Sequence, residues 1–331
     1  MFKRILVPLD GSSLAEKALP LAARLAKVSG GTITLLHISN LTIEYGPYMA
    51  QPFAYIESTL EADIEQARLY LDDIERSPVL KNIKVQKEAL SGEPAQCILD
   101  FAQSDADLII ICSHGRTGFK RWAMGSIAQK VARYSTKPVL IVNSEHTAFP
   151  ATTTTSTHPI NILVGLDGSA LAEAVLLPAA QLSAALNASG KGSLHLLRVV
   201  EIIQEMRHEA TTTINEMNEQ TVAIARTYLQ KVENRLQSGD FAMFHLKVTA
   251  SIATSYDTAD ILVREAEQGE RRDDGTEHEG CDIIALATHG LGGLQRWVMG
   301  SVTERVLGST KLPMLIVRST EGEADIHQEK L

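Results

Sequence analysis

The chain contains two copies of one sequence pattern, and this duplication limits the folds it can adopt more than any other feature. Ile5–Ser12 reads Ile-Leu-Val-Pro-Leu-Asp-Gly-Ser, and Ile162–Ser169 repeats it with one change, glycine for proline. Near the end of each copy, Pro138–Val142 is matched by Pro313–Val317. A repeat of this length indicates a duplicated domain, because solenoid units span only roughly 20–45 residues.

The chain length agrees with two domains, since 331 residues can form two separate cores. We expect a first domain at residues 1–147, a linker at 148–159, a second domain at 160–318 and an acidic tail at 319–331. Threonine and proline dominate the linker, and no apolar period runs through it. The second copy is longer, and we place most of its insertion in the polar stretch 269–280.

Short apolar runs alternate with longer helical patterns in each copy. The expected strands are residues 4–10, 32–39, 82–90, 107–113 and 138–143, and then 160–166, 193–200, 242–250, 282–288 and 313–318. The helical patterns of the first copy are at 13–27, 56–74 and 94–102. Strands that are apolar nearly throughout, joined by helices, predict two tandem α/β domains, each with a doubly wound parallel sheet covered on both faces.

An aspartate and a glycine loop mark the edge of each expected sheet where a ligand would bind. Asp10 and Asp167 end the two first strands, and ligands of open α/β sheets bind beyond the carboxyl ends of strands. After each fourth strand come a glycine, nine intervening residues and a Gly-Ser pair that enters a helix; these are Gly115, Gly125 and Ser126, and then Gly290, Gly300 and Ser301.

Such a loop is suited to a phosphate group. Glycine lets the backbone approach closely, and a helix N-terminus offers free N–H groups and the positive end of its dipole. The alternative is structural: the glycines only turn the chain, and the serines only cap their helices.

The glycine loop, the aspartate that ends the first strand and the Lys-Pro-Val-Leu-Ile-Val run together resemble the universal stress proteins, here in a tandem two-domain form. The resemblance implies an adenine-nucleotide alpha-hydrolase-like fold with strand order 3-2-1-4-5 and an ATP site where the strand order reverses. It also implies pairing of fifth strands, either between the two domains of one chain or in a homodimer.

The ATP site implied by the resemblance maps onto both copies. In the first copy the matching positions are Asp10, Ile38, Cys112, Gly115, Gly125, Ser126 and Ile127. In the second copy they are Asp167, Val199, Ala287, Gly290, Gly300, Ser301, Val302 and Thr303. The aspartates would bond adenosine, the backbones of Ile38 and Val199 would read the adenine edge, and the glycine loops would hold the phosphates.

The sequence departs from the family pattern at one position in each copy. Cys112 and Ala287 stand where the family has its first glycine, so a side chain occupies space that glycine leaves open. Thr303 keeps a hydroxyl where the first copy has Ala128, which favours the second copy as a triphosphate site. Mg²⁺ could accompany ATP, because the protein need supply only a hydroxyl and the phosphates the rest.

Other residues of the loops are assigned structural roles. His114 and His289 lack neighbours at metal-ligand spacing, so we expect structural hydrogen bonds from them. Cys112 has no neighbour at a known spacing that would activate its thiol. Trp122 and Trp297 occupy equivalent places before the Gly-Ser pairs, and we expect them to pack in the fold or at an interface.

Composition excludes several classes of partner. A net charge of −9 and a pI near 5.6 disfavour binding of nucleic acid or anionic membrane by bulk charge. No apolar run approaches the roughly 18 residues of a membrane span, and the first ten residues do not read as a secretory signal. With only three scattered cysteines, the sequence predicts a cytoplasmic protein.

The leading hypothesis is a stress-response protein that binds ATP or a related adenine nucleotide, with a regulatory or protective role. The sequence has no Walker P-loop, no His-Glu-x-x-His and no Gly-x-Ser-x-Gly, so it gives no sign of rapid turnover or enzymatic activity. One alternative is an interaction scaffold that binds no nucleotide, and another is a slow ATP hydrolase. The sequence does not identify a protein partner.

Overall fold

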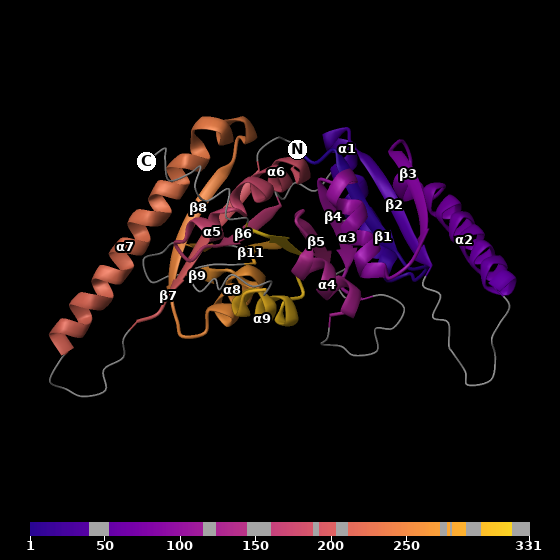
Figure 1. Cartoon of the computed structure of the whole chain (residues 1–331). Helices are drawn as coiled ribbons and strands as arrows, with labels where there is room; N and C mark the ends of the chain where they lie inside the picture. The colour runs from indigo at the N-terminus through magenta and orange to yellow at the C-terminus, as the bar shows by residue number, and fades with distance from the viewer. Residues whose placement is uncertain are drawn as a thin grey trace, which may run out of the picture. The chain divides into compact units, whose positions relative to one another are not determined.

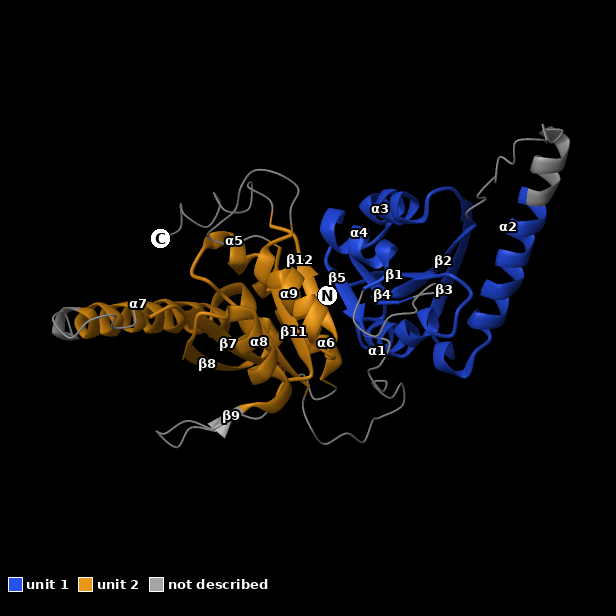
Figure 2. Ribbon diagram, turned by 90° about the horizontal axis from the view of Figure 1, so that it is seen from below, with its two compact units in different colours: residues 1–153 blue, residues 154–331 orange. Residues whose placement is uncertain are grey.

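A computed structural model of the chain forms two compact units, residues 1–153 and residues 154–331 (Figure 2). The structure describes residues 1–39, 53–114, 124–143, 160–187, 192–202, 211–271, 277–278, 280–288 and 299–319. The linker expected at 148–159 lies outside these residues.

The first unit alternates strands and helices as predicted. Its elements are β1 (Arg4–Leu9), a 3₁₀ helix (Ala15–Ala18), α1 (Leu19–Ser29), β2 (Thr32–Ser39), α2 (Phe53–Glu75), a 3₁₀ helix (Pro78–Leu80), β3 (Lys84–Ser91), α3 (Pro94–Asp105), β4 (Leu108–Cys112), α4 (Ser126–Tyr134) and β5 (Val139–Val142) (Figure 1). All neighbouring strands are parallel, in the order β3-β2-β1-β4-β5. Figure 2 shows α3 and α4 on one side of these strands and α1 on the other.

The second unit repeats this arrangement with one insertion. Its elements are β6 (Asn161–Gly165), α5 (Ala170–Glu173), α6 (Leu176–Leu186), β7 (Ser193–Val200), α7 (Thr211–Gln237), a 3₁₀ helix (Gly239–Phe244), β8 (Lys247–Thr254), α8 (Thr258–Gln268), β9 (Glu270–Arg271), β10 (Glu277–His278), β11 (Ile283–Ala287), α9 (Ser301–Ser309) and β12 (Met314–Val317). The parallel order is β8-β7-β6-β11-β12. The predicted α/β class and strand order 3-2-1-4-5 are therefore confirmed in both copies.

The inserted stretch 269–280 contains a short antiparallel ribbon of its own. Glu277 of β10 pairs with Arg271 of β9, and His278 pairs with Glu270. Most of the extra residues of the second copy thus lie between the end of α8 and the start of β11.

The third strand of the second copy was predicted wrongly, at 242–250 instead of 247–254. The apolar residues that suggested an early start lie in the 3₁₀ helix, where Phe244 is buried and its ring lies 6.4 Å from that of Phe241. His245 then adopts a left-handed conformation with φ of +47°, which ends the 3₁₀ helix before the strand starts. The apolar residues of this 3₁₀ helix therefore resemble the start of a strand in the sequence.

The helical pattern predicted at 13–27 is split in the structure between a 3₁₀ helix and α1. Pro20 lies at the start of α1 and has no backbone N–H, so it cannot donate to the residue four positions earlier. Proline is tolerated in the first turn of an α-helix, where N–H groups have no intrahelical acceptor. The 3₁₀ helix therefore leads directly into α1, and Pro20 lies in the first turn of α1.

The core of each unit lies along its central strands. In β1, Ile5, Leu6 and Val7 are fully buried, as are Ile162 and Leu163 in β6. Strands buried on both faces are expected where helices cover a parallel sheet on both sides. The strand interiors are therefore occupied by packing, and the polar residues that could bind a ligand lie at the strand ends.

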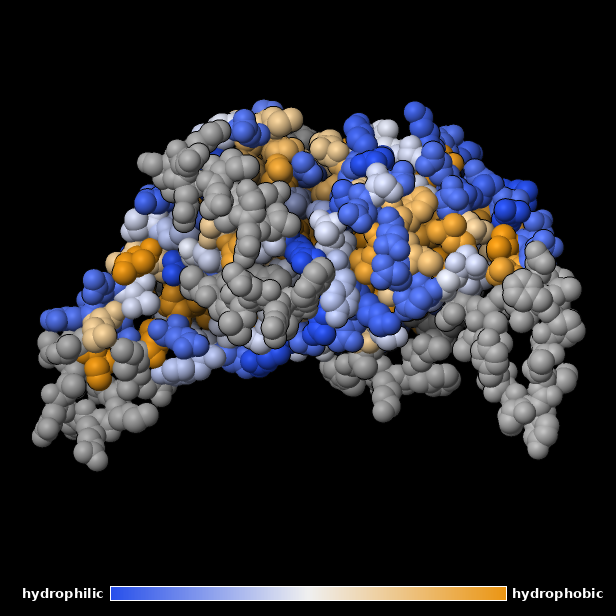
Figure 3. All heavy atoms as spheres, viewed as in Figure 1, coloured by the Kyte–Doolittle hydropathy of each residue, from blue (hydrophilic) through white to orange (hydrophobic). Residues whose placement is uncertain are grey.

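The surface mixes polar and apolar side chains. Figure 3 shows hydrophilic and hydrophobic residues interspersed on the face in view, and exposed apolar residues such as Leu69, Ile224 and Met243 are scattered along the chain. Among the described residues, no helix combines the length and the apolar character needed to cross a bilayer.

Candidate functional site

A tight turn fixes the aspartate at the end of the first strand in each copy. In the first copy, Asp10 Oδ1 accepts hydrogen bonds from the Ser12 N–H at 3.0 Å and from the Ser12 hydroxyl at 2.6 Å. In the second copy, Asp167 Oδ1 accepts the same two bonds from Ser169, at 2.9 and 2.7 Å. The intervening glycines have φ of +81° and +94°, a conformation that favours glycine.

The same serines join each aspartate to the helix that follows. The Ser12 hydroxyl accepts from the Ala15 N–H at 3.2 Å, and the Ser169 hydroxyl accepts from the Ala172 N–H at 3.1 Å. Each carboxylate is thus held at a fixed orientation beyond its strand. Each serine follows its aspartate by two residues in both repeats, but this role was not predicted from the sequence.

Gly125 precedes α4 and Gly300 precedes α9, and each glycine lets the start of its helix lie close to the backbone just after the fourth strand of its copy. The Gly125 N–H donates to Ser113 O at 2.8 Å, and the Gly300 N–H donates to Thr288 O at 2.6 Å. A Cβ on Gly125 would lie 3.3 Å from Ser113 O, and one on Gly300 only 2.8 Å from Thr288 O. Part of the structural alternative therefore holds, because these glycines do bring helix and strand end together.

The serines after these glycines do not cap their helices. Gly125 is the N-cap of α4 and Gly300 the N-cap of α9, and neither makes a side-chain cap hydrogen bond. Ser126 and Ser301 are the first residues of the helices, and both are exposed. Because the first turn of an α-helix leaves its N–H groups without intrahelical acceptors, each helix presents a set of donors near the strand ends.

Thr303 does not play the part that sequence analysis used to favour the second copy. Its hydroxyl is buried and donates to Ala287 O at 2.9 Å, which joins the first turn of α9 to the end of β11. Since its proton is engaged in this bond, the hydroxyl gives the second copy no additional free donor over the first, where Ala128 is buried at the same place.

The residues in place of the family's first glycine end the fourth strands. Cys112 is the last residue of β4 and Ala287 the last of β11, and both are buried. Burial raises the pKa of the Cys112 thiol, so the thiolate that redox chemistry requires is disfavoured. This agrees with a packing role for Cys112.

Ile38 and Val199, whose backbones are expected to read the base, lie where β2 extends beyond β1 and where β7 extends beyond β6. The last residue of β1 in register with β2 is Leu9, opposite His37, so Ile38 pairs only with Leu90 of β3. Val199 likewise pairs with Ala253 of β8, beyond the end of β6. Both residues are half-buried, and the register places them beyond the ends of β1 and β6, which Asp10 and Asp167 follow.

A salt bridge anchors each glycine-capped helix. Lys130 of α4 contacts Glu93, the N-cap of α3, at 3.0 Å, and Arg305 of α9 contacts Asp257, the N-cap of α8, at 2.6 Å. The two pairs join equivalent helices in the two copies, and all four side chains are exposed.

A model of the universal stress protein family matches residues 1–143 and 160–318, the two copies found in the sequence. The chain belongs to the universal stress protein family. The universal stress protein YxiE of Bacillus subtilis is 31% identical over 147 residues, which cover 43% of this chain and 99% of YxiE. A universal stress protein of Mycolicibacterium smegmatis is 26% identical over 321 residues, which cover 95% of this chain and 96% of that protein.

A solved universal stress protein of Archaeoglobus fulgidus has a similar fold. It is 21% identical, with a TM-score of 0.60, and the likeness covers 95% of this chain and 97% of that one. The similarity to the Mycolicibacterium and Archaeoglobus proteins thus extends over both copies of this chain.

Five loop residues with roles predicted from the sequence are not among those that the structure describes. Gly115, Gly290, His289, Trp122 and Trp297 lie outside the described residues. His114 is described, and its Nδ1 lies 3.0 Å from the Ser113 hydroxyl, in agreement with a structural hydrogen bond.

A tyrosine from the long helix of each copy joins the site, and sequence analysis missed both. The Tyr70 hydroxyl of α2 donates to Glu16 Oε1 at 3.1 Å, and its ring meets the His37 ring edge-on at 5.7 Å. Burial and the Glu16 charge raise the Tyr70 pKa, and the charge of Asp10 adds to the effect. The hydroxyl therefore stays protonated close to the aspartate.

The second copy has a matching arrangement around Tyr228 of α7. Burial and the Glu173 carboxylate raise the Tyr228 pKa, with a further contribution from Asp167. Glu173 also accepts from Arg235 at 2.6 Å. In the sequence, Glu16 and Glu173 each follow their aspartate by 6 residues, and Tyr70 and Tyr228 follow it by 60 and 61.

Proposed function

We propose that each copy binds an adenine nucleotide, ATP or a close relative, at the carboxyl edge of its sheet. The observation that carries the proposal is a pairing built twice: an aspartate fixed by a serine turn, and a helix whose glycine-capped N-terminus has no side-chain cap. The carboxylate accepts hydrogen bonds from a nucleoside, and the helix N–H groups and dipole favour phosphate. The role of binding is regulatory or protective.

Membership of the family agrees with the proposal. One universal stress protein was solved in complex with cAMP. It is 20% identical, with a TM-score of 0.30, and the similarity covers 43% of this chain and 98% of that one. That similarity is too low to transfer a ligand, so the proposal rests on the residues of this chain.

The exposed serines suit a Mg²⁺ ion that arrives with the nucleotide. Ser126 and Ser301 have hydroxyls at the helix N-termini, and Mg²⁺ commonly takes one or two protein ligands while phosphates and waters supply the rest. Among the described residues no group of three His, Cys, Asp or Glu side chains could hold a metal ion. A bound Mg²⁺ would neutralise phosphate charge, while the chain itself would orient the nucleotide.

Binding without rapid turnover is part of the proposal. The sequence has none of the motifs that commonly position a nucleophile or a transferred phosphate, so we assign a binding role rather than an enzymatic one. We further propose a cytoplasmic location and association through the fifth strands, within the chain or in a homodimer.

The second candidate function is an interaction scaffold that binds no nucleotide. Cys112 and Ala287 favour it, because each places side-chain atoms where the family pattern has glycine. In a scaffold, the serine turns and the glycine-capped helices would serve the fold alone.

Analysis of bound nucleotide separates the two functions. The purified protein would be denatured and the released nucleotide identified, and the stripped protein would then be titrated with Mg-ATP by calorimetry. We expect adenine nucleotide in the released fraction and saturable binding by the stripped protein. Absence of both nucleotide and heat at millimolar ATP would favour the scaffold.

A further inference from the structure

The two copies differ in the side chain that covers the glycine of the Asp-Gly-Ser turn. In the first copy this is His37, whose Cε1 would lie 4.0 Å from a Cβ on Gly11. In the second copy it is Arg198, whose guanidinium atoms would lie 2.9–3.1 Å from a Cβ on Gly168. The strand register places these two side chains at equivalent positions, one residue before Ile38 and Val199.

The Arg198 guanidinium lies over the Tyr228 ring and close to the turn. Its Cζ is 5.1 Å from the centroid of that ring, and its atoms would lie 2.9–3.1 Å from a Cβ on Gly168. Stacking of this kind orients the planar fork of an arginine before any ligand arrives. Within the described part of the chain, its N–H groups meet no hydrogen-bond acceptor.

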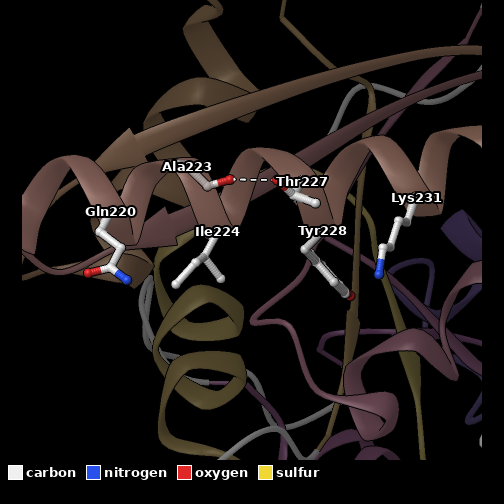
Figure 4. A pocket seen from close by; sticks show the side chains of 6 residues that line it. All are labelled: Gln220, Ala223, Ile224, Thr227, Tyr228 and Lys231. Carbon is white, nitrogen blue, oxygen red and sulfur yellow. Dashed lines mark hydrogen bonds between the residues drawn. The ribbon is translucent and has the colours of Figure 1, made fainter.

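An open hollow reaches the same tyrosine. A cavity of about 380 Å³ lies along α7 and is lined by Gln220, Ala223, Ile224, Thr227, Tyr228 and Lys231. Figure 4 shows the Tyr228 ring and the Ile224 side chain extending from the same side of the helix toward this space. Tyr228 therefore links an accessible surface to Arg198 and to the turn that holds Asp167.

A carboxylate and an arginine fork together suit one purine edge better than the other. An arginine fork pairs with two adjacent acceptors, as guanine offers at O6 and N7, whereas adenine places an amino donor beside N7. The carboxylate of Asp167 accepts N–H donors from either purine. A single imidazole such as His37 cannot present two parallel donors.

We propose that Arg198 makes the second copy accept guanine nucleotides, whereas the first copy, with His37, selects adenine nucleotides. The proposal rests on the proposed function, because it assumes that a nucleoside lies beside Asp167 and Val199. Arg198 is a specificity-determining residue in this account. The phosphates would be held at the N-terminus of α9, as they would be at α4 in the first copy.

The test compares Mg-ATP and Mg-GTP binding to the full-length chain by calorimetry. We expect the wild type to bind one GTP per chain, and Arg198→His to weaken GTP binding by about tenfold or more while ATP binding changes less than about threefold. His37→Arg should add a second GTP site. Arg264→His, an exposed arginine of α8, is the matched control and should change neither affinity.

Two further probes keep the test decisive. Inosine triphosphate keeps O6 and N7 but lacks the 2-amino group, so it should follow GTP across the variants. Arg198→Lys keeps the charge without the fork and should lose GTP preference even if Arg198→His folds poorly.

The outcomes are distinct. Equal weakening of ATP and GTP by Arg198→His would overturn the proposal, since the contact would then be to phosphate or ribose. Wild-type binding of ATP without GTP would overturn it and leave the proposed function standing. Failure of both nucleotides to bind would overturn both.

Discussion

The hydroxyl of Thr303 donates to the carbonyl of Ala287 at 2.9 Å, so the first turn of α9 is bonded directly to the end of β11. In the first copy the equivalent position is Ala128, and no hydroxyl is present there. The two helix N-termini are therefore positioned by different means. In the second copy a side-chain hydrogen bond supplements the backbone bond from Gly300 to Thr288.

Thr303→Val should destabilise the second unit without abolishing nucleotide binding. Valine has nearly the same shape but leaves the buried Ala287 carbonyl without this donor, which we expect to cost about 1 kcal/mol. Urea unfolding measures the change, with Thr303→Ser as the control that keeps the hydroxyl. Loss of ATP binding at unchanged stability would instead assign the hydroxyl to the ligand.

Alanine should be tolerated worse at Gly300 than at Gly125. Both glycines have φ near −60°, so the backbone itself admits alanine, and the difference is steric. The added Cβ would lie 2.8 Å from a carbonyl oxygen at Gly300 and 3.3 Å at Gly125. We expect Gly300→Ala to cost about 1–3 kcal/mol and Gly125→Ala less, measured by urea unfolding. The reverse order would show that the two helix starts differ from this description.

Asp107 should make the stability of the first unit depend on pH. Burial opposes its ionisation, but hydrogen bonds from the Lys3 N–H and from Arg4 outweigh burial and hold the Asp107 pKa below its usual value. Its contribution is therefore present above the pKa of the unfolded chain and is lost as pH falls through the lower folded value.

Asp107→Asn should thus cost about 1–2 kcal/mol at pH 7, and the difference from wild type should shrink below about pH 4. Unfolding by urea across this pH range measures it. Asp73→Asn, whose side chain is 80% exposed, is the control. A difference that does not change with pH would contradict the assigned ionisation.

The three cysteines should differ in reactivity. Burial and the nearby charges of Asp282 and Glu265 raise the pKa of Cys281 to about 12, and Cys112 is also buried, with a raised pKa. Cys97 is half-buried, and its pKa is raised as well.

Alkylation of the native protein at pH 8 should therefore modify Cys97 first, because burial shields Cys112 and Cys281 from the reagent and disfavours their thiolates. Peptide mass spectrometry locates the label, and alkylation in urea shows the reactivity of the unfolded chain. Early modification of Cys281 would contradict the burial of that residue.

The sequence predicted the parts of the fold that depend on periodicity and repetition. Runs such as Ile5–Leu9 are apolar because helices cover both faces of the sheet. Their recurrence predicted two domains and indicated the aspartates that follow the first strands. The third strand of the second copy was misplaced, because Phe241 and Phe244 pack in a 3₁₀ helix that has the composition of a strand.

The site was predicted less completely because it depends on contacts between distant elements. Tyr70 and Tyr228 follow Asp10 and Asp167 by 60 and 61 residues, a separation too long for a local sequence pattern to link them. The role of Thr303 was also misread, since the direction of its hydroxyl bond depends on packing against β11. Residues within one turn, such as Ser12, left a readable spacing, whereas residues brought together by the fold did not.

The most direct test of the central claim counts nucleotides bound by aspartate variants. Asp10→Asn and Asp167→Asn each keep an oxygen that can accept from the neighbouring serine while they remove the charge, so the turns should persist. Native mass spectrometry of the full-length chain in saturating Mg-ATP should give two nucleotides for the wild type, one for each single variant and none for the double variant. Two nucleotides bound to a folded double variant, or none bound to the wild type, would contradict the account.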